Sequence, residues 1–223
     1  MSASSLRHPL LEAWGIAHGF GVRGEPEPEA VVRPQQVHGI EVMRADPGSE
    51  RPGEADAIVS GVPGLRVAVV TADCLPILLA DERGRAVAAV HAGWRGLARG
   101  VIPRAVAALH QELGAPAPLR AVVGPCIGPC CYEIDEPVIA AMEPRFRDEL
   151  AGALRSRGGG HALLDLAALA RADLARAGLT VGAIGGFPAA CTRCDATRFH
   201  SYRRDGARAG RLLHWIACHP PQA

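Results

Sequence analysis

The chain has 223 residues and a formal net charge of +1 at neutral pH. This length favours a single domain with a substantial core, and the balanced charge gives no sign of a nucleic-acid or anionic membrane partner. All 24 basic residues are arginines, so Schiff-base chemistry and general-base catalysis by lysine are excluded.

No apolar stretch is long enough to cross a membrane, and residues 1–20 lack the charged start and apolar run of a signal peptide. The seven cysteines, of which Cys130 and Cys131 are adjacent, do not suggest a disulfide framework. In a cytoplasmic protein, clustered Cys and His residues indicate metal binding or catalysis. We therefore expect a cytoplasmic protein with reduced thiols.

Short apolar runs near the N-terminus predict short strands over Val31–Val32 and Val37–Met43, or a strand with a loop, and a buried strand over Leu65–Val70. The stretch Arg44–Glu54 is rich in Pro, Gly and charged residues, which is typical of a loop.

The runs Leu75–Ala80 and Arg85–Val90 flank a short polar turn and predict a β-hairpin. In this hairpin Cys74 would face His91. Residues that face each other on antiparallel strands have Cβ atoms about 4.5–5.5 Å apart, so both side chains could ligate one ion. Pro76 disfavours a regular ladder, so the register could slip.

The rest of the chain alternates loosely between helices and strands. The predicted elements are a helix over Leu97–Leu113 that starts properly near Val101, a strand over Leu119–Gly124, helices over Asp135–Ala141 and Arg145–Leu154, a loop at Gly158–Gly160, a helix over Leu163–Ala177 ended by Gly178, and strands over Leu179–Ile184 and Leu212–Ala217. This pattern favours a mixed α+β layered sandwich over a doubly wound parallel sheet. No internal repeat or domain boundary divides residues 1–223.

Three residues in glycine-rich surroundings predict a metal site: His38 in QQVHG, Cys74 in TADC and His91 in VHAGWRG. One thiolate and two neutral imidazoles form a zinc ligand set that leaves a fourth position for water, whose pKa zinc lowers to about 7. Asp73 could orient a ligand or carry a proton, or it could simply cap a turn. Each ligand alone is weakly specific, because a lone His or Cys on a strand is usually structural.

A second candidate cluster consists of cysteines. Cys126, Cys130 and Cys131 could combine with the CxxC pair Cys191 and Cys194 in a structural zinc site. Small buried cysteines are the alternative. A thioredoxin-type redox pair is disfavoured, because this CxxC does not begin a helix after a strand.

The segment Phe199–Gly206 (FHSYRRDG) concentrates hydroxyl, imidazole and guanidinium groups. Arginine binds phosphate with two parallel hydrogen bonds, so this segment could hold an anionic or hydroxyl-rich substrate. A solvated turn is the alternative. The zinc deaminase signature H-x-E with P-C-x-x-C is absent from the sequence, which disfavours the nucleobase-deaminase fold.

Six motifs in the same order resemble the YfiH-type family, also called the laccase-domain, multicopper polyphenol oxidase or peptidoglycan editing factor family. They are QQVHG, ADAIV, TADCLPILL, VHAGWRGL, GPCIGPCCYEI and RFHSYRRDG. The resemblance extends from about Gly19 to Ile216 and implies a single domain with a four-layer α/β/β/α sandwich, also seen in the catalytic domain of cytotoxic necrotizing factors. The stretch between Gly24 and Pro34 is shorter than is usual in the family, so the N-terminal part of the domain is reduced.

The resemblance implies a zinc-dependent purine nucleoside phosphorylase that cleaves adenosine, inosine, guanosine or methylthioadenosine with phosphate. Some members also deaminate adenosine. It places zinc on His38, Cys74 and His91, and we assign catalytic roles to Cys74, His91 and Asp73. The expected substrate-binding residues are Arg23, Gln36, Ser201 and Arg203 by resemblance, and Arg95 because it is close to His91 in sequence.

Three other functions stay open at this point. Cys74 and His91 could act as nucleophile and base of an amide hydrolase that edits peptidoglycan precursors. Copper-dependent phenol oxidation fits less well, because blue-copper centres add an axial Met and none of the three Met residues is close to Cys74 or His91 in sequence. A zinc-stabilised scaffold without turnover is the third alternative. The physiological substrate, the acid that protonates the leaving base and the presence of a homo-oligomer are not determined by the sequence.

Overall fold

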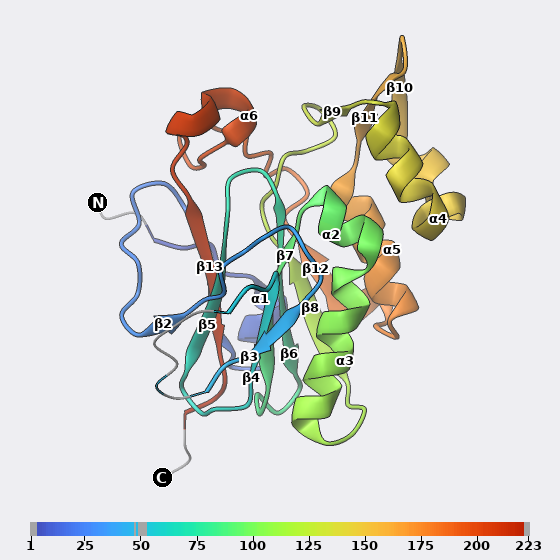
Figure 1. Cartoon of the computed structure of the whole chain (residues 1–223). Helices are drawn as coiled ribbons and strands as arrows, with labels where there is room; N and C mark the ends of the chain where they lie inside the picture. Colours follow the sequence, from blue (N-terminus) through green and yellow to red (C-terminus); the bar gives the residue numbers. More distant parts are fainter. Residues whose placement is uncertain (1–3, 47, 49–52, 221–223) are drawn as a thin grey trace.

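The computed structural model describes residues 4–46, 48 and 53–220 (Figure 1). In chain order the strands are β1 (Ala17–Phe20), β2 (Val31–Val32), β3 (Val42–Arg44), β4 (Ala57–Ser60), β5 (Arg66–Thr71), β6 (Leu75–Asp81), β7 (Val87–Ala92), β8 (Leu119–Val123), β9 (Glu133–Ile134), β10 (Leu154–Gly158), β11 (His161–Leu164), β12 (Ile184–Gly186) and β13 (Leu212–Ala217). The helices are α1 (Pro9–Glu12), α2 (Trp94–Arg99), α3 (Val101–Leu113), α4 (Glu136–Ala153), α5 (Leu166–Arg176) and α6 (Tyr202–Asp205), with 3₁₀ turns at Val181–Ala183 and Gly206–Arg208.

Two sheets pack face to face. A six-stranded sheet has the order β12-β8-β6-β7-β4-β3, and a four-stranded sheet has the order β1-β13-β5-β2. Helices α2, α3 and α5 cover the outer face of the six-stranded sheet (Figure 1). A small sheet with the order β10-β11-β9 lies beside α4. The mixed α+β layered sandwich expected from the sequence is therefore confirmed.

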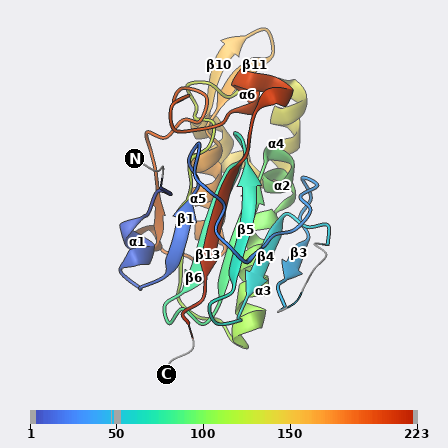
Figure 2. The same cartoon turned by 90° about the vertical axis from the view of Figure 1, so that its left-hand side faces the viewer.

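The outer face of the four-stranded sheet is covered differently. Figure 2 shows the chain after β1 crossing this face as an irregular segment, and no described helix forms a layer there. A small apolar cluster of Ala68, Leu213 and Trp215 lies on this face, with the guanidinium groups of Arg7 and Arg66 stacked over the Trp215 ring. The reduced stretch between Gly24 and Pro34 expected from the sequence is part of this crossing.

The central strands contribute to two cores in alternation. In β6, Leu75, Ile77 and Leu79 pack against the helices, whereas Leu78 and Ala80 pack between the sheets. Alternate side chains of a strand point to opposite faces, so a strand that is buried on both sides has a continuous apolar run. In β7, Val87 and Ala89 also face the second sheet, which places His91 at the end of the layer between the sheets.

Several predicted elements are confirmed by the structure. The strands at Val31–Val32 and Leu212–Ala217 have the predicted bounds, and those predicted over Leu65–Val70 and Leu119–Gly124 are within one residue. The long helix starts at Val101 as expected, and Gly178 follows α5 with a left-handed φ of +98°. The predicted loop Arg44–Glu54 includes residues 47 and 49–52, which are outside the described part of the chain.

Other predictions were wrong in their bounds. The strand expected within Val37–Met43 is limited to β3, and the residues before it form the loop that was the alternative, in which His38 has a φ of +59°. The predicted helix Leu97–Leu113 is two helices, since Gly100 adopts a φ of +88° between α2 and α3. The two helices predicted over residues 135–154 form one helix, α4, that is kinked at Phe146 just after Pro144.

The region after α4 contains one confirmed prediction and two errors. Gly158–Gly160 form the predicted loop, which is the turn of a hairpin in which all three glycines have positive φ. Residues 163–164, predicted to start a helix, belong to strand β11. The predicted strand Leu179–Ile184 contains a 3₁₀ turn at Val181–Ala183, and β12 begins at its last residue. Short apolar runs do not distinguish these elements, because both kinds place similar residues against the core. None of the helices in the described part of the chain is long and apolar enough to span a bilayer.

A matched pair of substitutions tests the packing between the two sheets through its effect on stability. Val87→Ala removes two methyl groups from a fully buried site between the sheets, and we expect the free energy of unfolding to fall by about 2 kcal/mol. Val181→Ala makes the same change where the side chain is 86% exposed, and it should leave stability nearly unchanged. Urea unfolding of both variants measures the difference; equal stability would contradict the assigned packing.

Candidate metal centre

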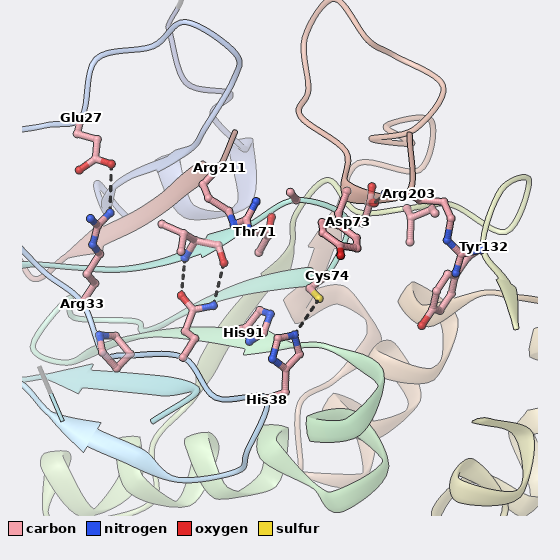
Figure 3. A pocket seen from close by; sticks show the side chains of 16 residues that line it. Glu27, Arg33, His38, Thr71, Asp73, Cys74, His91, Tyr132, Arg203 and Arg211 are labelled. Atoms are coloured by element: carbon pink, nitrogen blue, oxygen red, sulfur yellow. Dashed lines mark hydrogen bonds and ion pairs between the residues drawn. The ribbon is translucent and has the colours of Figure 1, made fainter. Parts of the chain in front are cut away.

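The structure brings His38, Cys74 and His91 together at one end of the layer between the sheets. His38 comes from the loop before β3, Cys74 immediately precedes β6, and His91 lies in β7. Their ligand atoms lie within 4.8 Å of one another, with Cys74 Sγ 3.9 Å from His38 Nε2. Figure 3 shows the three side chains converging at the floor of a cavity.

The hairpin that carries two of these residues has a different register from the predicted one. Leu75 pairs with Ala92, and Pro76 pairs with His91, so the pairing differs by two residues from the expected one. The turn is longer because the Asp81 carboxylate accepts hydrogen bonds from the backbone N–H groups of Arg85 and Ala86. A shift of two residues preserves the faces of both strands. Cys74 and His91 therefore remain on the same side, as diagonal neighbours.

The space among the three side chains suits a metal ion. A Cβ atom on Gly93 would lie 3.2 Å from His38 Cδ2, 3.3 Å from Cys74 Sγ and 3.7 Å from His91 Cε1, so the missing side chain keeps this space open. One sulfur and two imidazole nitrogens form a donor set typical of zinc and copper sites. These residues therefore fit a three-ligand metal centre with one position free for another group.

Asp56 orients this centre, a role that the sequence analysis missed. Its buried carboxylate lies 2.6 Å from His91 Nδ1 and accepts hydrogen bonds from the backbone N–H groups of His38 (3.0 Å) and Gly39 (2.5 Å). A carboxylate on Nδ1 fixes the tautomer of a histidine and leaves Nε2 for the metal. The available signal was an acidic residue next to the apolar strand run in ADAIV, because a buried charge needs partners.

The same contacts shift the ionisation of the ligands. Burial disfavours the thiolate, yet the contacts with His38 and His91 outweigh burial and lower the pKa of Cys74 to about 6. Burial likewise disfavours the imidazolium of His91, but Asp56 and Cys74 raise its pKa to about 9. Without a metal, Cys74 and His91 therefore form a thiolate–imidazolium pair.

Asp73 precedes Cys74 but is not one of the three ligands, and its carboxylate binds another part of the chain. Its carboxylate accepts hydrogen bonds from Thr192 Oγ1 (2.6 Å), Ser201 Oγ (3.0 Å) and the backbone N–H of Arg203 (2.6 Å). Its backbone has a left-handed φ of +98°, which is uncommon for a residue other than glycine. Asp73 thus joins the stretch after β5 to the segment 192–203, and its role as an orienting group or proton carrier stays a prediction.

A cavity of about 680 Å³ opens above the three ligands (Figure 3). Two of the predicted substrate-binding residues, Gln36 and Arg203, line it. Both ends of the Gln36 amide are hydrogen-bonded to the backbone of Val70, so this side chain fixes the wall. The other side chains that line the cavity and carry polar groups include Glu27, Arg33, Thr71, Tyr132, Tyr202 and Arg211.

Three predicted substrate-binding residues lie outside the cavity lining. Arg23 donates hydrogen bonds to the carbonyls of Ala196 and Arg198. Arg95 is exposed, with its guanidinium 4.4 Å from the centre of the Trp94 ring. Ser201 is buried and caps α6 by accepting a hydrogen bond from the N–H of Arg204. A role for any of them in substrate binding stays a prediction.

The fold and the ligand group define a layered α+β protein with a His–Cys–His centre at the edge of two sheets. The family described as multi-copper polyphenol oxidoreductase laccase matches residues 21–219. The chain therefore belongs to this laccase-domain, YfiH-type family, which confirms the resemblance drawn from the six motifs.

Named relatives support this membership. A purine nucleoside phosphorylase of Xylella fastidiosa is 44% identical over 191 residues, which cover 82% of this chain and 71% of the relative. The purine nucleoside phosphorylase YfiH of Escherichia coli is 38% identical over 182 residues, with the same shares. The crystal structure of YlmD from Geobacillus stearothermophilus has a TM-score of 0.87 at 25% identity and covers 98% of this chain and 97% of that chain.

Gly93 provides a direct test of the metal centre. Gly93→Ala would place a methyl group among the three ligands, so we expect the protein to lose the metal at this centre while it stays folded, because the φ of −64° at this position accommodates alanine. Gly152→Ala is the control, since a Cβ there meets no atom within 4 Å. The difference in metal content between the purified Gly93 and Gly152 variants measures the effect; equal metal content in the two would contradict the placement of an ion beside Gly93.

Asp56→Asn should weaken the same centre by a different route. The amide cannot hold His91 in the metal-binding tautomer as a carboxylate does, and we expect metal affinity to fall on the order of 10- to 100-fold. Asp46→Asn, which alters only a surface ion pair with Arg44, serves as the control. Competition with a chromophoric chelator gives the affinities. Equal affinities in the two variants would refute the role of Asp56.

Proposed function

We propose that this chain is a zinc-dependent purine nucleoside phosphorylase. The observation that carries the proposal is the position of the His38–Cys74–His91 group at the floor of a cavity large enough for a nucleoside and a phosphate ion. The printed names of the relatives, purine nucleoside phosphorylase, support the same reaction class.

Aromatic and cationic side chains line this cavity in a way that suits both substrates. Tyr132 and Tyr202 offer faces against which a purine can pack, and the guanidinium of Arg203 lies 5.5 Å from the centre of the Tyr132 ring. Arg33 and Arg211 add positive charge on the opposite side, as Figure 3 shows. Guanidinium groups bind phosphate with paired hydrogen bonds, so the arginines would hold the attacking phosphate.

The protein groups around the ligands would position the reacting atoms. Zinc, when bound, would act as a Lewis acid on an oxygen of the substrate or of water. Asp56 would keep His91 in place through Nδ1, and Asp73 would hold the segment that carries Arg203 against the cavity. Attack of water at the purine C6 would account for an additional adenosine deaminase activity at the same centre.

One observation supports a second candidate function. The contacts that lower the pKa of Cys74 to about 6 also make it a candidate nucleophile, with His91 beside it as a proton carrier. Such a pair could hydrolyse an amide, as in the editing of peptidoglycan precursors. Zinc decides between the two functions, because a thiolate that ligates zinc is not free to attack. Phenol oxidation by copper has less support, since no methionine in the described part of the chain lines the cavity.

The test is incubation of the zinc-loaded protein with adenosine, with and without phosphate, followed by chromatography. We expect adenine to form only with phosphate, and inosine or hypoxanthine to reveal deamination. His38→Ala should abolish both activities, because it removes one ligand. His110→Ala is the matched control; this side chain lies on α3 and contacts the carbonyl of Ala117, away from the cavity.

Unchanged adenosine in both tubes, with zinc bound and the fold intact, would refute the proposed phosphorylase activity on adenosine. Activity of the metal-free protein on a peptidoglycan precursor, abolished by Cys74→Ser, would establish the hydrolase in its place. A protein that binds zinc, loses thermal stability in the His38 variant and turns over neither substrate would be a scaffold.

A further inference from the structure

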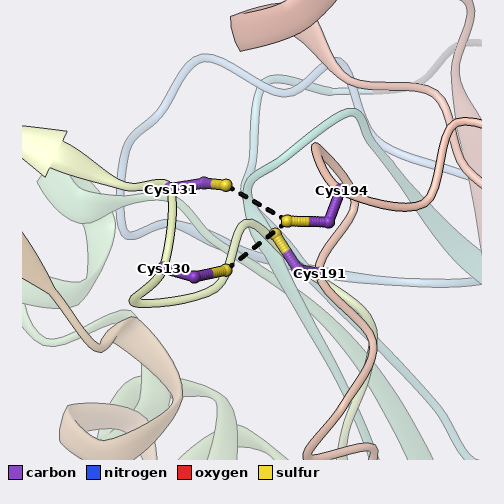
Figure 4. Close-up of side chains that lie close together, drawn as sticks. All are labelled: Cys130, Cys131, Cys191 and Cys194. Carbon is purple, nitrogen blue, oxygen red and sulfur yellow. Dashed lines mark hydrogen bonds between the residues drawn. The ribbon is translucent and has the colours of Figure 1, made fainter.

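Four thiols converge at a second place in the molecule, outside the candidate metal centre. Cys130 and Cys131 lie in the turn after β8, and Cys191 and Cys194 lie in the segment after β12 (Figure 4). About sixty residues of sequence separate the two pairs, yet the four sulfur atoms all lie within 4.8 Å of one another. The fifth member of the predicted cluster, Cys126, is buried in the apolar core and is not part of this group.

The spacing of the sulfur atoms matches a tetrahedral site. Cys194 Sγ lies 3.3 Å from Cys131 Sγ and 3.6 Å from Cys130 Sγ. Four zinc–sulfur bonds of about 2.3 Å in a tetrahedron put neighbouring sulfurs about 3.8 Å apart. A disulfide would require about 2.05 Å between two of these atoms, which leaves the other two thiols unexplained.

The backbone around the thiols is arranged to support thiolates. The N–H of Gly128 points at Cys191 Sγ over 3.2 Å, and the Cys191 carbonyl accepts a hydrogen bond from the N–H of Asp195, which closes the CxxC segment into a turn. A Cβ on Gly128 would lie 3.2 Å from Cys191 Cβ and 3.4 Å from Cys130 Sγ, so glycine allows the turn to approach the sulfurs. Hydrogen bonds from backbone N–H groups to sulfur commonly accompany metal-bound thiolates.

We propose that Cys130, Cys131, Cys191 and Cys194 bind a second zinc ion as a closed, structural Cys₄ site. Four protein ligands leave no position for substrate, so this ion would hold the fold and would not react. The inference does not rest on the proposed phosphorylase activity, because it concerns different residues and a different readout.

The site would fix two segments of the chain that support the catalytic cavity. Tyr132, which lines the cavity, follows Cys131 directly. Thr192 follows Cys191, and its hydroxyl donates to Asp73, the neighbour of the ligand Cys74. An ion that joins the turn after β8 to the CxxC segment would therefore fix the positions of Tyr132 and Thr192 together. It would replace the weak thiol–thiol contacts by four metal–ligand bonds.

The experiment counts zinc in the purified full-length protein by elemental mass spectrometry. We expect about two zinc ions per chain in the unaltered protein and about one in the double variant His38→Ala, Cys74→Ala, because the second ligand group is untouched. The double variant Cys130→Ser, Cys194→Ser should also hold about one, and Cys126→Ala, outside the group, should keep both. Cobalt in the His38, Cys74 variant should show the absorption of tetrahedral thiolate ligation.

Clear results would overturn the proposal. The first such result is the absence of zinc from the variant that lacks His38 and Cys74. The four cysteines are unchanged in this variant, so a loss of zinc could not be attributed to an altered cluster. Iron in place of zinc at this site would refute the assigned metal. A disulfide between Cys131 and Cys194, detected by peptide mass spectrometry of the protein purified without reductant, would replace the metal site altogether.

Discussion

The candidate centre depends on the hydrogen bonds of one buried group, the carboxylate of Asp56. It accepts hydrogen bonds from three consecutive backbone N–H groups, at Val37, His38 and Gly39, and it contacts the ring of His91. The loop that carries His38 is joined to its neighbours by an isolated bridge between Gln35 and Glu54, and at residues 37–39 the Asp56 side chain takes the place of strand pairing. The negative charge also offsets the cost of burying an imidazolium at His91. One residue thus fixes the loop, the orientation of a ligand and its protonation.

The alternation of the central strands explains why the centre lies where it does. Side chains at Val87, Ala89 and His91 point into the layer between the sheets, and the layer ends where the apolar residues of β7 end. His91 is therefore buried by the same packing that stabilises the domain. Cys74 lies just before β6, and its diagonal relation to His91 tolerates a register shift of two residues. His91 lies within a strand of the hairpin, Cys74 lies at the end of the loop that enters it, and His38 lies in a separate loop.

The sequence predicted the parts of the site that follow from local patterns, and it missed those that depend on tertiary contacts. The grouping of His38, Cys74 and His91 followed from motifs and a hairpin, and strong apolar runs located β5, β8 and β13. The roles of Asp56 and Asp73 depend on bonds to segments far along the chain, which no local pattern contains. The longer turn after β6 escaped prediction for the same reason, since the side chain of Asp81 builds it.

The two sides of the cavity depend on different parts of the chain. The floor and one wall consist of the sheet edge, Tyr132 and Arg203, which the Asp73 contacts and the proposed Cys₄ site hold in place. The opposite wall includes Glu27 and Arg33 from the irregular segment that crosses the four-stranded sheet. That segment contributes none of the three ligands except through the loop at His38. We therefore expect changes in the length of this segment to alter the shape and charge of the cavity more than the positions of Cys74 and His91, which depend on β6, β7 and Asp56.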